Sequence, residues 1–404
     1  MLDGLDDVQW ARLGHAYGPA DDVPDLIRAL CSPEEKERAA ALHQLYGNIF
    51  HQGTRYEATA YAVPFLLEVL AAPATRDRAA LLGLLAAITV GYDENWLPDA
   101  IPIAEFRAEA VGGAAVLAAG PHPGDPDYDE DEGDYAYLES LTAEQDGQLG
   151  AYVALAAYDA VRAGVPLFRE LLGAADPGVR TMAAYTLAWF AEDAAGSVPA
   201  LEGLLATEED EGVAATALVA IGLLCEPAPA VSGVWGSGVE AFLTDDRPAV
   251  RWAAAVAGAR VLGHGAGSDV VDELLSWTRG GRGSREEIPF LDGDLAGYAG
   301  QALAQVGPRH TGAAYDALLA RLPDVSGSET LPVLTEALRM AFPEGWPDGA
   351  PASGLDDRQR RLARVLAENA GPWRLGELTF ANVSNLVRSF GLPGDREAMA
   401  AFLD

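Results

Sequence analysis

The sequence predicts an all-α fold, a solenoid of stacked antiparallel helix pairs with an inserted acidic loop. Three observations lead to this prediction. One helix–turn–helix phrase recurs along the 404 residues, and leucine and isoleucine recur within each copy at the spacing of one helix face. In addition, 50% of the residues are hydrophobic although the formal net charge is −34. This much apolar material can offset the conformational entropy of folding, which excludes a disordered acidic chain.

The recurring phrase is Val-Pro, a leucine-rich helix, a turn marked by Pro or Asp, and an alanine-rich helix. Copies begin at Val23, Val63, Val165 and Val198, and a fifth copy, without the proline, begins at Val239. Proline is expected just inside the start of the first helix, where the N–H groups have no helical partner, and the turn Asp is expected to cap the second helix. One helix pair cannot bury its apolar stripe alone, so neighbouring pairs should stack.

Two copies share a more specific stretch, Asp-x-x-Val-Arg-x-x-Ala-Ala or a variant with one more residue. Its residues are Asp176, Val179, Arg180, Ala183 and Ala184 in one copy, and Asp246, Val250, Arg251, Ala253 and Ala254 in the other. The stretch resembles HEAT repeats, in particular the HEAT-like repeats of phycobilisome lyases. This resemblance implies a HEAT/armadillo-like solenoid in which Arg180 and Arg251 are structural. It leaves function open, because such solenoids serve as scaffolds, inhibitors, lyase subunits and DNA-repair glycosylases.

The repeats and their interruptions predict four regions. These are N-terminal helical repeats at 1–90, an irregular helical insertion at 91–164 that contains an acidic loop at 121–137, HEAT-like repeats at 165–310, and divergent helical repeats with a cap at 311–404. The terminal repeats are expected to differ from the others because their outer faces meet water.

The insertion concentrates negative charge. Between Ala108 and Val161 there are 12 acidic residues and no Lys or Arg, so the loop is expected to be extended and solvated. Alternatively, the loop docks on a basic protein partner through its acidic and tyrosine side chains. The candidate binding residues are Asp127, Tyr128, Asp129, Glu130, Asp131, Glu132, Asp134, Tyr135 and Tyr137.

Calcium binding is a third interpretation of the acidic loop, because its first aspartates follow the spacing of an EF-hand. The pattern departs from that motif where Glu130 takes the glycine position and Ala136 takes the position of the bidentate glutamate. We therefore predict neither a metal site nor a cofactor.

The connection at 46–57 is rich in polar and aromatic residues where a solenoid usually has a short turn. One interpretation is that these residues cap helix ends and close the array. The other is a pocket of a lyase-like or small-molecule-binding enzyme. The candidate pocket residues are Asn48, His51, Arg55, Tyr56 and Glu57.

The charge also restricts the partners. A chain with 27 Lys and Arg against 61 Asp and Glu is not suited to grip nucleic acid or an anionic membrane. Metal-site and nucleophile motifs are missing from the sequence, and Cys31 and Cys225 are predicted to be buried thiols. We expect a cytoplasmic protein-interaction module with a basic protein partner, acting as an inhibitor (an immunity protein) or a scaffold, rather than an enzyme.

Overall fold

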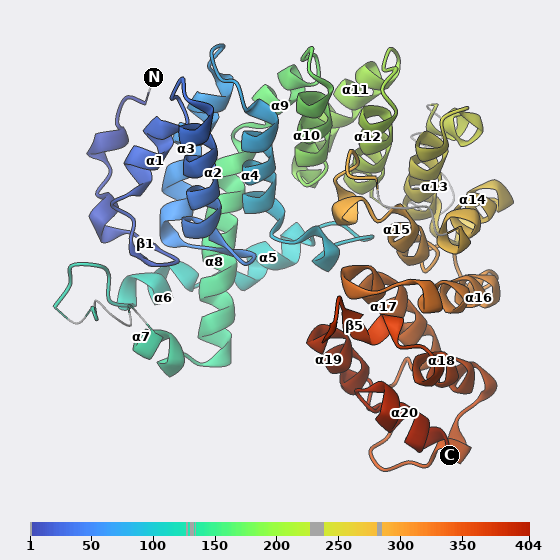
Figure 1. Ribbon diagram of the computed structural model, residues 1–404. Helices are drawn as coiled ribbons and strands as arrows, with labels where there is room; N and C mark the ends of the chain where they lie inside the picture. The colour runs from blue at the N-terminus through green and yellow to red at the C-terminus, as the bar shows by residue number, and fades with distance from the viewer. Residues whose placement is uncertain (1, 127, 130–132, 134, 227–237, 281–284) are drawn as a thin grey trace. The chain divides into compact units, whose positions relative to one another are not determined.

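The structure is a computed structural model that describes residues 2–126, 128–129, 133, 135–226, 238–280 and 285–404 (Figure 1). The chain divides into two units. Unit 1 comprises Met1–Trp96 with Ala100–Thr207, and unit 2 comprises Leu97–Asp99 with Glu208–Asp404. The regular structure of both units is overwhelmingly helical, as the repeats predict.

Unit 1 is built from helix pairs. Its helices are α1 (Val23–Ala29), α2 (Glu35–Asn48), α3 (Glu57–Ala71), α4 (Arg78–Val90), α5 (Ile103–Glu109), α6 (Gly113–Ala119), α7 (Tyr135–Ser140), α8 (Ala143–Arg162), α9 (Val165–Leu171), α10 (Pro177–Leu187) and α11 (Ala194–Leu205). The long helix α8 packs on α3 and α4, and α4 packs on α10. The helices of the insertion therefore pack against the repeats of unit 1.

The Val-Pro phrase marks a helix start in only part of the copies. It opens α1 and α9, as predicted. In α3 and α11, however, Pro64 and Pro199 lie inside the helix, so the prediction is wrong for these copies. Both helices begin several residues earlier than the phrase: α3 starts at Glu57 and α11 starts at Ala194.

An arginine in the first turns of the second helix fastens the turn of each repeat. Arg180 Nη1 donates to the carbonyls of residues 174 and 175, and Arg251 Nη1 donates to those of residues 245 and 246. Arg38 does the same for residues 32 and 33. These bonds satisfy carbonyls at the end of the preceding helix or in the turn. Arg180 and Arg251 are thus structural, and the bonds described here run within a repeat.

Unit 2 continues with helices of the same kind. They are α12 (Glu211–Leu224), α13 (Pro248–Leu262), α14 (Ser268–Arg279), α15 (Leu295–Ala302), α16 (Thr311–Arg321), α17 (Thr330–Ala341), α18 (Asp357–Glu368), α19 (Ala381–Ser389) and α20 (Arg396–Leu403). Small residues let α12 and α13 approach closely: a Cβ on Gly222 would lie 2.8 Å from the Cα of Ala257. The C-terminal helices share an apolar core that includes Phe342, Leu362 and Trp373.

Three short antiparallel β-hairpins were not predicted from the sequence. They join β1 (Gly14–His15) to β2 (Gly18–Pro19), β3 (Phe50–His51) to β4 (Thr54–Arg55), and β5 (Arg374–Leu375) to β6 (Leu378–Thr379). The first and third hairpins each follow a 3-10 helix that carries a buried tryptophan, and each leads into a helix, α1 or α19. The segment at 46–57 is therefore a helix end followed by a hairpin.

The cysteines differ from the prediction of two buried thiols. Cys31 is exposed because it lies in the turn after α1, and Cys225 is half-buried at the end of α12. Within the described residues, no helix has the length and apolar character needed to cross a membrane.

Candidate functional site

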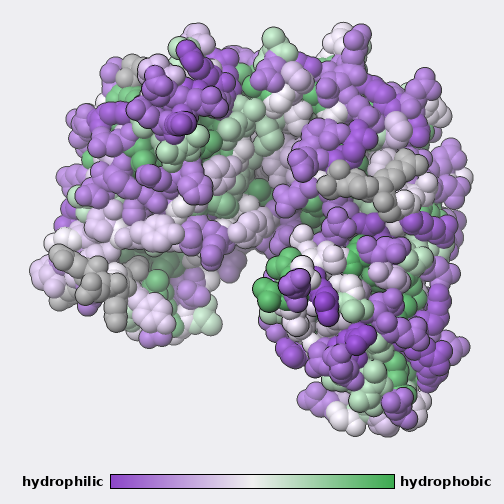
Figure 2. Space-filling model, viewed as in Figure 1, coloured by the Kyte–Doolittle hydropathy of each residue, from purple (hydrophilic) through white to green (hydrophobic). Residues whose placement is uncertain are grey.

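A cavity of about 640 Å³ lies in unit 1 where two hairpins meet the acidic insertion. We call it the hairpin cavity. Its lining comes from residues 14–18 of the first hairpin, residues 54–57 at the end of the second, residues 120–123 after α6, and side chains of α6, α7 and α8. Green and pale side chains gather around α6 and α7 on a surface that is otherwise mostly hydrophilic (Figure 2).

Polar bonds fix the first hairpin at the mouth of the cavity. Asp22 Oδ1 lies 3.1 Å from His15 Nε2, and Asp22 Oδ2 accepts from Asn48 Nδ2 at 2.5 Å. The backbone N–H of Ala16 donates to the carbonyl of Asn48. Asn48 therefore joins the first hairpin to the end of α2, and the exposed ring of Tyr17 lies 5.4 Å from that of His51.

The second hairpin turns at Gln52 and Gly53, both of which have positive φ. A side chain on Gly53 would meet the ring of Tyr92 at 2.8 Å, so glycine is required there for space as well as for conformation. Arg55 Nη1 donates to the carbonyl of Gly53, and Nη2 donates to that of Thr89 in the last turn of α4. Burial lowers the pKa of Arg55 to about 10. Its guanidinium is thus directed toward the end of α4, where a cation is favourable.

The described part of the acidic loop is bound to unit 1. Arg12 Nη2 donates to Asp125 Oδ1 at 2.7 Å, and Asp125 Oδ2 accepts from the backbone N–H of His122. His122 Nδ1 lies 3.4 Å from Glu57 Oε2 at the start of α3. These bonds contradict the expectation of an extended, solvated loop for residues 121–126. The positive charge that the insertion lacks comes from Arg12, before the first repeat.

The hydrogen bond from Arg12 has an electrostatic consequence. The bond, together with the backbone N–H of His122, holds the pKa of Asp125 below its usual range. Asp125, the first aspartate of the EF-hand-like spacing, is therefore already engaged by an arginine and a backbone donor.

The tyrosines of the insertion lie in different environments. Tyr137 is half-buried on α7 and donates its hydroxyl proton to the carbonyl of Val116 at 2.6 Å, whereas Tyr135 on the same helix is exposed. Tyr128 is half-buried and lines the hairpin cavity. The described Asp129 is exposed. The other candidate binding residues, Asp127, Glu130, Asp131, Glu132 and Asp134, lie outside the described residues.

The hairpin cavity brings together parts of both candidate sites. Arg55, Tyr56 and Glu57 line it from one side, and Tyr128 and Tyr137 line it from the other. Sequence analysis treated the two segments as alternatives. It missed two further lining residues, His15 and Tyr17, and it missed Arg12, because all three precede the first repeat and belong to no recognisable motif.

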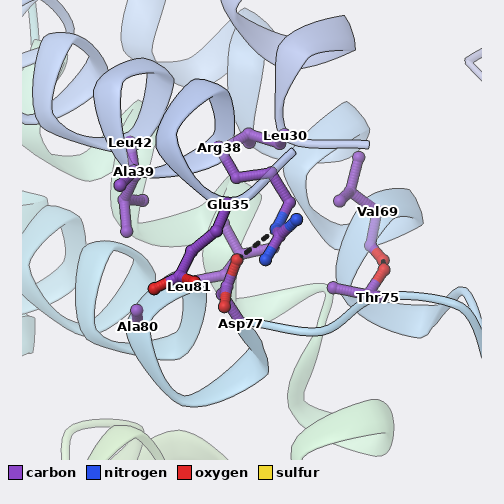
Figure 3. A pocket seen from close by; sticks show the side chains of 10 residues that line it. All are labelled: Leu30, Glu35, Arg38, Ala39, Leu42, Val69, Thr75, Asp77, Ala80 and Leu81. Carbon is purple, nitrogen blue, oxygen red and sulfur yellow. Dashed lines mark hydrogen bonds and ion pairs between the residues drawn. The ribbon is translucent and has the colours of Figure 1, made fainter. Parts of the chain in front are cut away.

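A second cavity, of about 190 Å³, lies between the first two helix pairs (Figure 3). Arg38 points into it and meets Asp77, with Nε to Oδ2 at 2.5 Å, while Nη1 is bound to the two turn carbonyls. Most of the other lining is aliphatic, including Leu42 and Leu81. The arginine is used to join two repeats, so this cavity is a packing gap spanned by an ion pair.

Comparisons with known proteins identify the repeats. Residues 136–222 match the family model described as HEAT repeats. One similar solved structure is the crystal structure of an engineered protein from the Northeast Structural Genomics Consortium, with 20% identity, coverage of 94% of this chain and 98% of that chain, and a TM-score of 0.32. No curated protein matches the chain.

Proposed function

We propose that this HEAT-repeat chain binds a basic protein segment through the acidic insertion of unit 1. HEAT repeats are generally protein-interaction modules, because stacked helix pairs present extended surfaces to a partner. The finer assignment, a basic partner bound at 121–137, is our proposal. The likeness to phycobilisome lyases stays a prediction from sequence.

The observation that carries the proposal is the position of the insertion. Arg12 and Glu57 fasten the start of the loop beside the hairpin cavity, so that its acidic run follows directly on a fixed point. Within 108–161 there is no Lys or Arg to neutralise that run. Carboxylates steer a cationic partner toward the site, and the adjacent tyrosines supply contact area with few rotatable bonds.

A module of this kind affects its partner by covering it or by holding it. Covering the cationic surface of a toxin would make the chain an immunity protein, and holding a basic protein next to another would make it a scaffold. Both roles need the same binding event, which is what we test.

The test is anisotropy titration of a fluorescein-labelled deca-lysine peptide with the full chain. The loop variant carries Asp127→Asn, Glu130→Gln, Asp131→Asn, Glu132→Gln and Asp134→Asn. The matched control neutralises five exposed acidic residues of unit 2, with Asp272→Asn, Glu286→Gln, Asp324→Asn, Glu344→Gln and Asp348→Asn. Both variants change the net charge equally, so they separate a located site from general attraction.

We expect the loop variant to bind about tenfold more weakly or worse, and the control to bind within about twofold of the parent chain, because nearby charges dominate over distant screened ones. Equal losses in both variants would contradict the proposal. A deca-glutamate peptide that binds as well as deca-lysine would do the same.

A second candidate function, binding or turnover of a small molecule at 46–57, is favoured by the volume of the hairpin cavity, which is typical of ligand pockets. A metabolite that raises the melting temperature of the parent chain, but not that of a Glu57→Ala variant, would support this candidate.

A further inference from the structure

We propose that the hairpin cavity receives one arginine or lysine side chain of the bound basic segment. This inference rests on the proposed function and goes beyond it, because it names the group that enters the cavity and the residues that select it.

The aromatic part of the lining fits a cation. Tyr17, Tyr56, Tyr128 and Tyr137 reach the cavity from four separate segments of unit 1. Tyr17 is 68% exposed and the other three are half-buried, so ring surface is accessible from the cavity. The face of a tyrosine ring attracts a guanidinium or ammonium group, and tyrosine hydroxyls can accept hydrogen bonds from it.

The charged part of the lining also favours a cation. Glu57 and Asp146 both line the cavity, and Asp146 is exposed with no ion-pair partner among the described residues. Arg55 is the one Lys or Arg among the described lining residues, and it donates to the carbonyls of Gly53 and Thr89. An entering cation therefore meets two carboxylates, while the guanidinium of Arg55 is occupied by backbone carbonyls.

The apolar part of the lining suits a long side chain rather than a small ion. Leucine, valine and proline side chains make up much of the remaining lining, among them Leu117, Leu149 and Val153. The methylene groups of Arg and Lys bury along such surfaces while the charged end stays among polar groups. A volume of about 640 Å³ leaves room for the residues that flank the entering side chain.

The experiment uses the full chain labelled with 3-fluorotyrosine and followed by 19F NMR. The probes are N-acetyl-arginine amide and its neutral isostere, N-acetyl-citrulline amide, and single Tyr→Phe variants assign the signals. We expect the arginine probe to shift the signals of Tyr17, Tyr56, Tyr128 and Tyr137 in a saturable way, and the citrulline probe to leave them in place.

Two variants on the first turns of α8 test the carboxylate. Asp146→Asn removes a charge from the lining, whereas Glu144→Gln removes the same charge two residues away, from a residue outside the lining. We expect the first to weaken arginine binding by about fivefold, the effect of losing one partly exposed ion pair, and the second to change it by less than about twofold.

The outcomes separate this inference from the proposed function. If deca-lysine binds at the loop but the arginine probe leaves the tyrosine signals in place, the inference is wrong and the proposed function stands. Equal shifts with arginine and citrulline, or equal losses in Asp146→Asn and Glu144→Gln, also overturn it. If neither deca-lysine nor the arginine probe binds, both proposals fail.

Discussion

The first and third hairpins share one local architecture but present different surfaces. In each, a buried tryptophan in a 3-10 helix donates its indole N–H to a backbone carbonyl: Trp10 to Leu5 at 2.7 Å and Trp373 to Leu366 at 2.8 Å. In each, a further backbone bond closes the base of the hairpin, from Ala20 to Leu13 and from Phe380 to Trp373. The framework is therefore the same in unit 1 and unit 2.

The two hairpins differ in the side chains that they carry. In unit 1, the first hairpin carries His15 and Tyr17, which are tied to neighbouring segments and line the hairpin cavity. In unit 2, the third hairpin carries Leu375 and Leu378, which are 52% and 73% exposed, and Figure 2 shows a green patch near the position of β5. The comparison teaches that the framework maintains the fold of each unit, while the hairpin residues determine whether a polar site forms.

The largest expected effect concerns the shared framework. We expect Trp10→Ala and Trp373→Ala each to lower the free energy of unfolding of its own unit by about 3–5 kcal/mol, because each removes a buried aromatic ring and leaves a cavity. Urea unfolding followed by hydrogen exchange, which assigns the loss to a unit, measures this. Trp→Phe at the same positions should cost less because it retains most of the packing. A negligible loss at either site would break the equivalence.

The next effect separates the hairpins by the space around their turns. Gly53 and Gly376 both have positive φ, but only Gly53 has a ring, that of Tyr92, within 3 Å of the position of a Cβ. We expect Gly376→Ala to cost about 1–2 kcal/mol from backbone strain and Gly53→Ala about 2–4 kcal/mol from strain and overlap together. Thermal and urea unfolding of the two variants gives the comparison. Equal losses would show that Tyr92 yields without cost.

Helix pairs were predictable from this sequence because each copy carries its own periodicity and turn chemistry, as in α9 and α10. The hairpins were not, because a two-residue strand such as Phe50–His51 has no alternation that could be recognised. Proline also misled: Pro64 and Pro199 were assigned to helix starts, yet both lie within helices whose earlier turns have little apolar pattern.

The candidate residues were predictable as segments but not as one site. The density of acidic and aromatic residues identified both 46–57 and 121–137, yet nothing local shows that Tyr56 and Tyr137 line one cavity. The docking of the loop depends on Arg12, which lies 113 residues from Asp125 in sequence. Such a pairing is fixed by tertiary packing, which a single sequence does not encode as a pattern.

A smaller effect separates the side chains that the hairpins present. Tyr17→Ser in unit 1 and Leu378→Ser in unit 2 both change exposed residues, so we expect each to alter the free energy of unfolding by less than about 0.5 kcal/mol. Deca-lysine binding should weaken about two- to fivefold in Tyr17→Ser, through loss of a cation–π contact, and stay unchanged in Leu378→Ser. Anisotropy titration measures both. A loss in Leu378→Ser as large as that in Tyr17→Ser would contradict the division of roles.

The smallest effect concerns the bond that fastens the acidic loop in unit 1. Because the hydrogen bond from Arg12 lowers the pKa of Asp125, the folded chain binds that proton less tightly than an unfolded chain does. The bond therefore favours the docked loop at pH values above the ordinary range of an aspartate, and this contribution is lost as the pH falls through the lowered pKa. In Arg12→Ala we expect the pKa of Asp125 to rise toward that of a free aspartate. A 13C NMR titration of side-chain carboxyls, assigned with Asp125→Asn, measures the shift, and Arg28→Ala, which breaks the exposed pair with Asp6, is the control. An Asp125 titration that is the same in Arg12→Ala and the parent chain would mean that the loop is held at this point without its arginine.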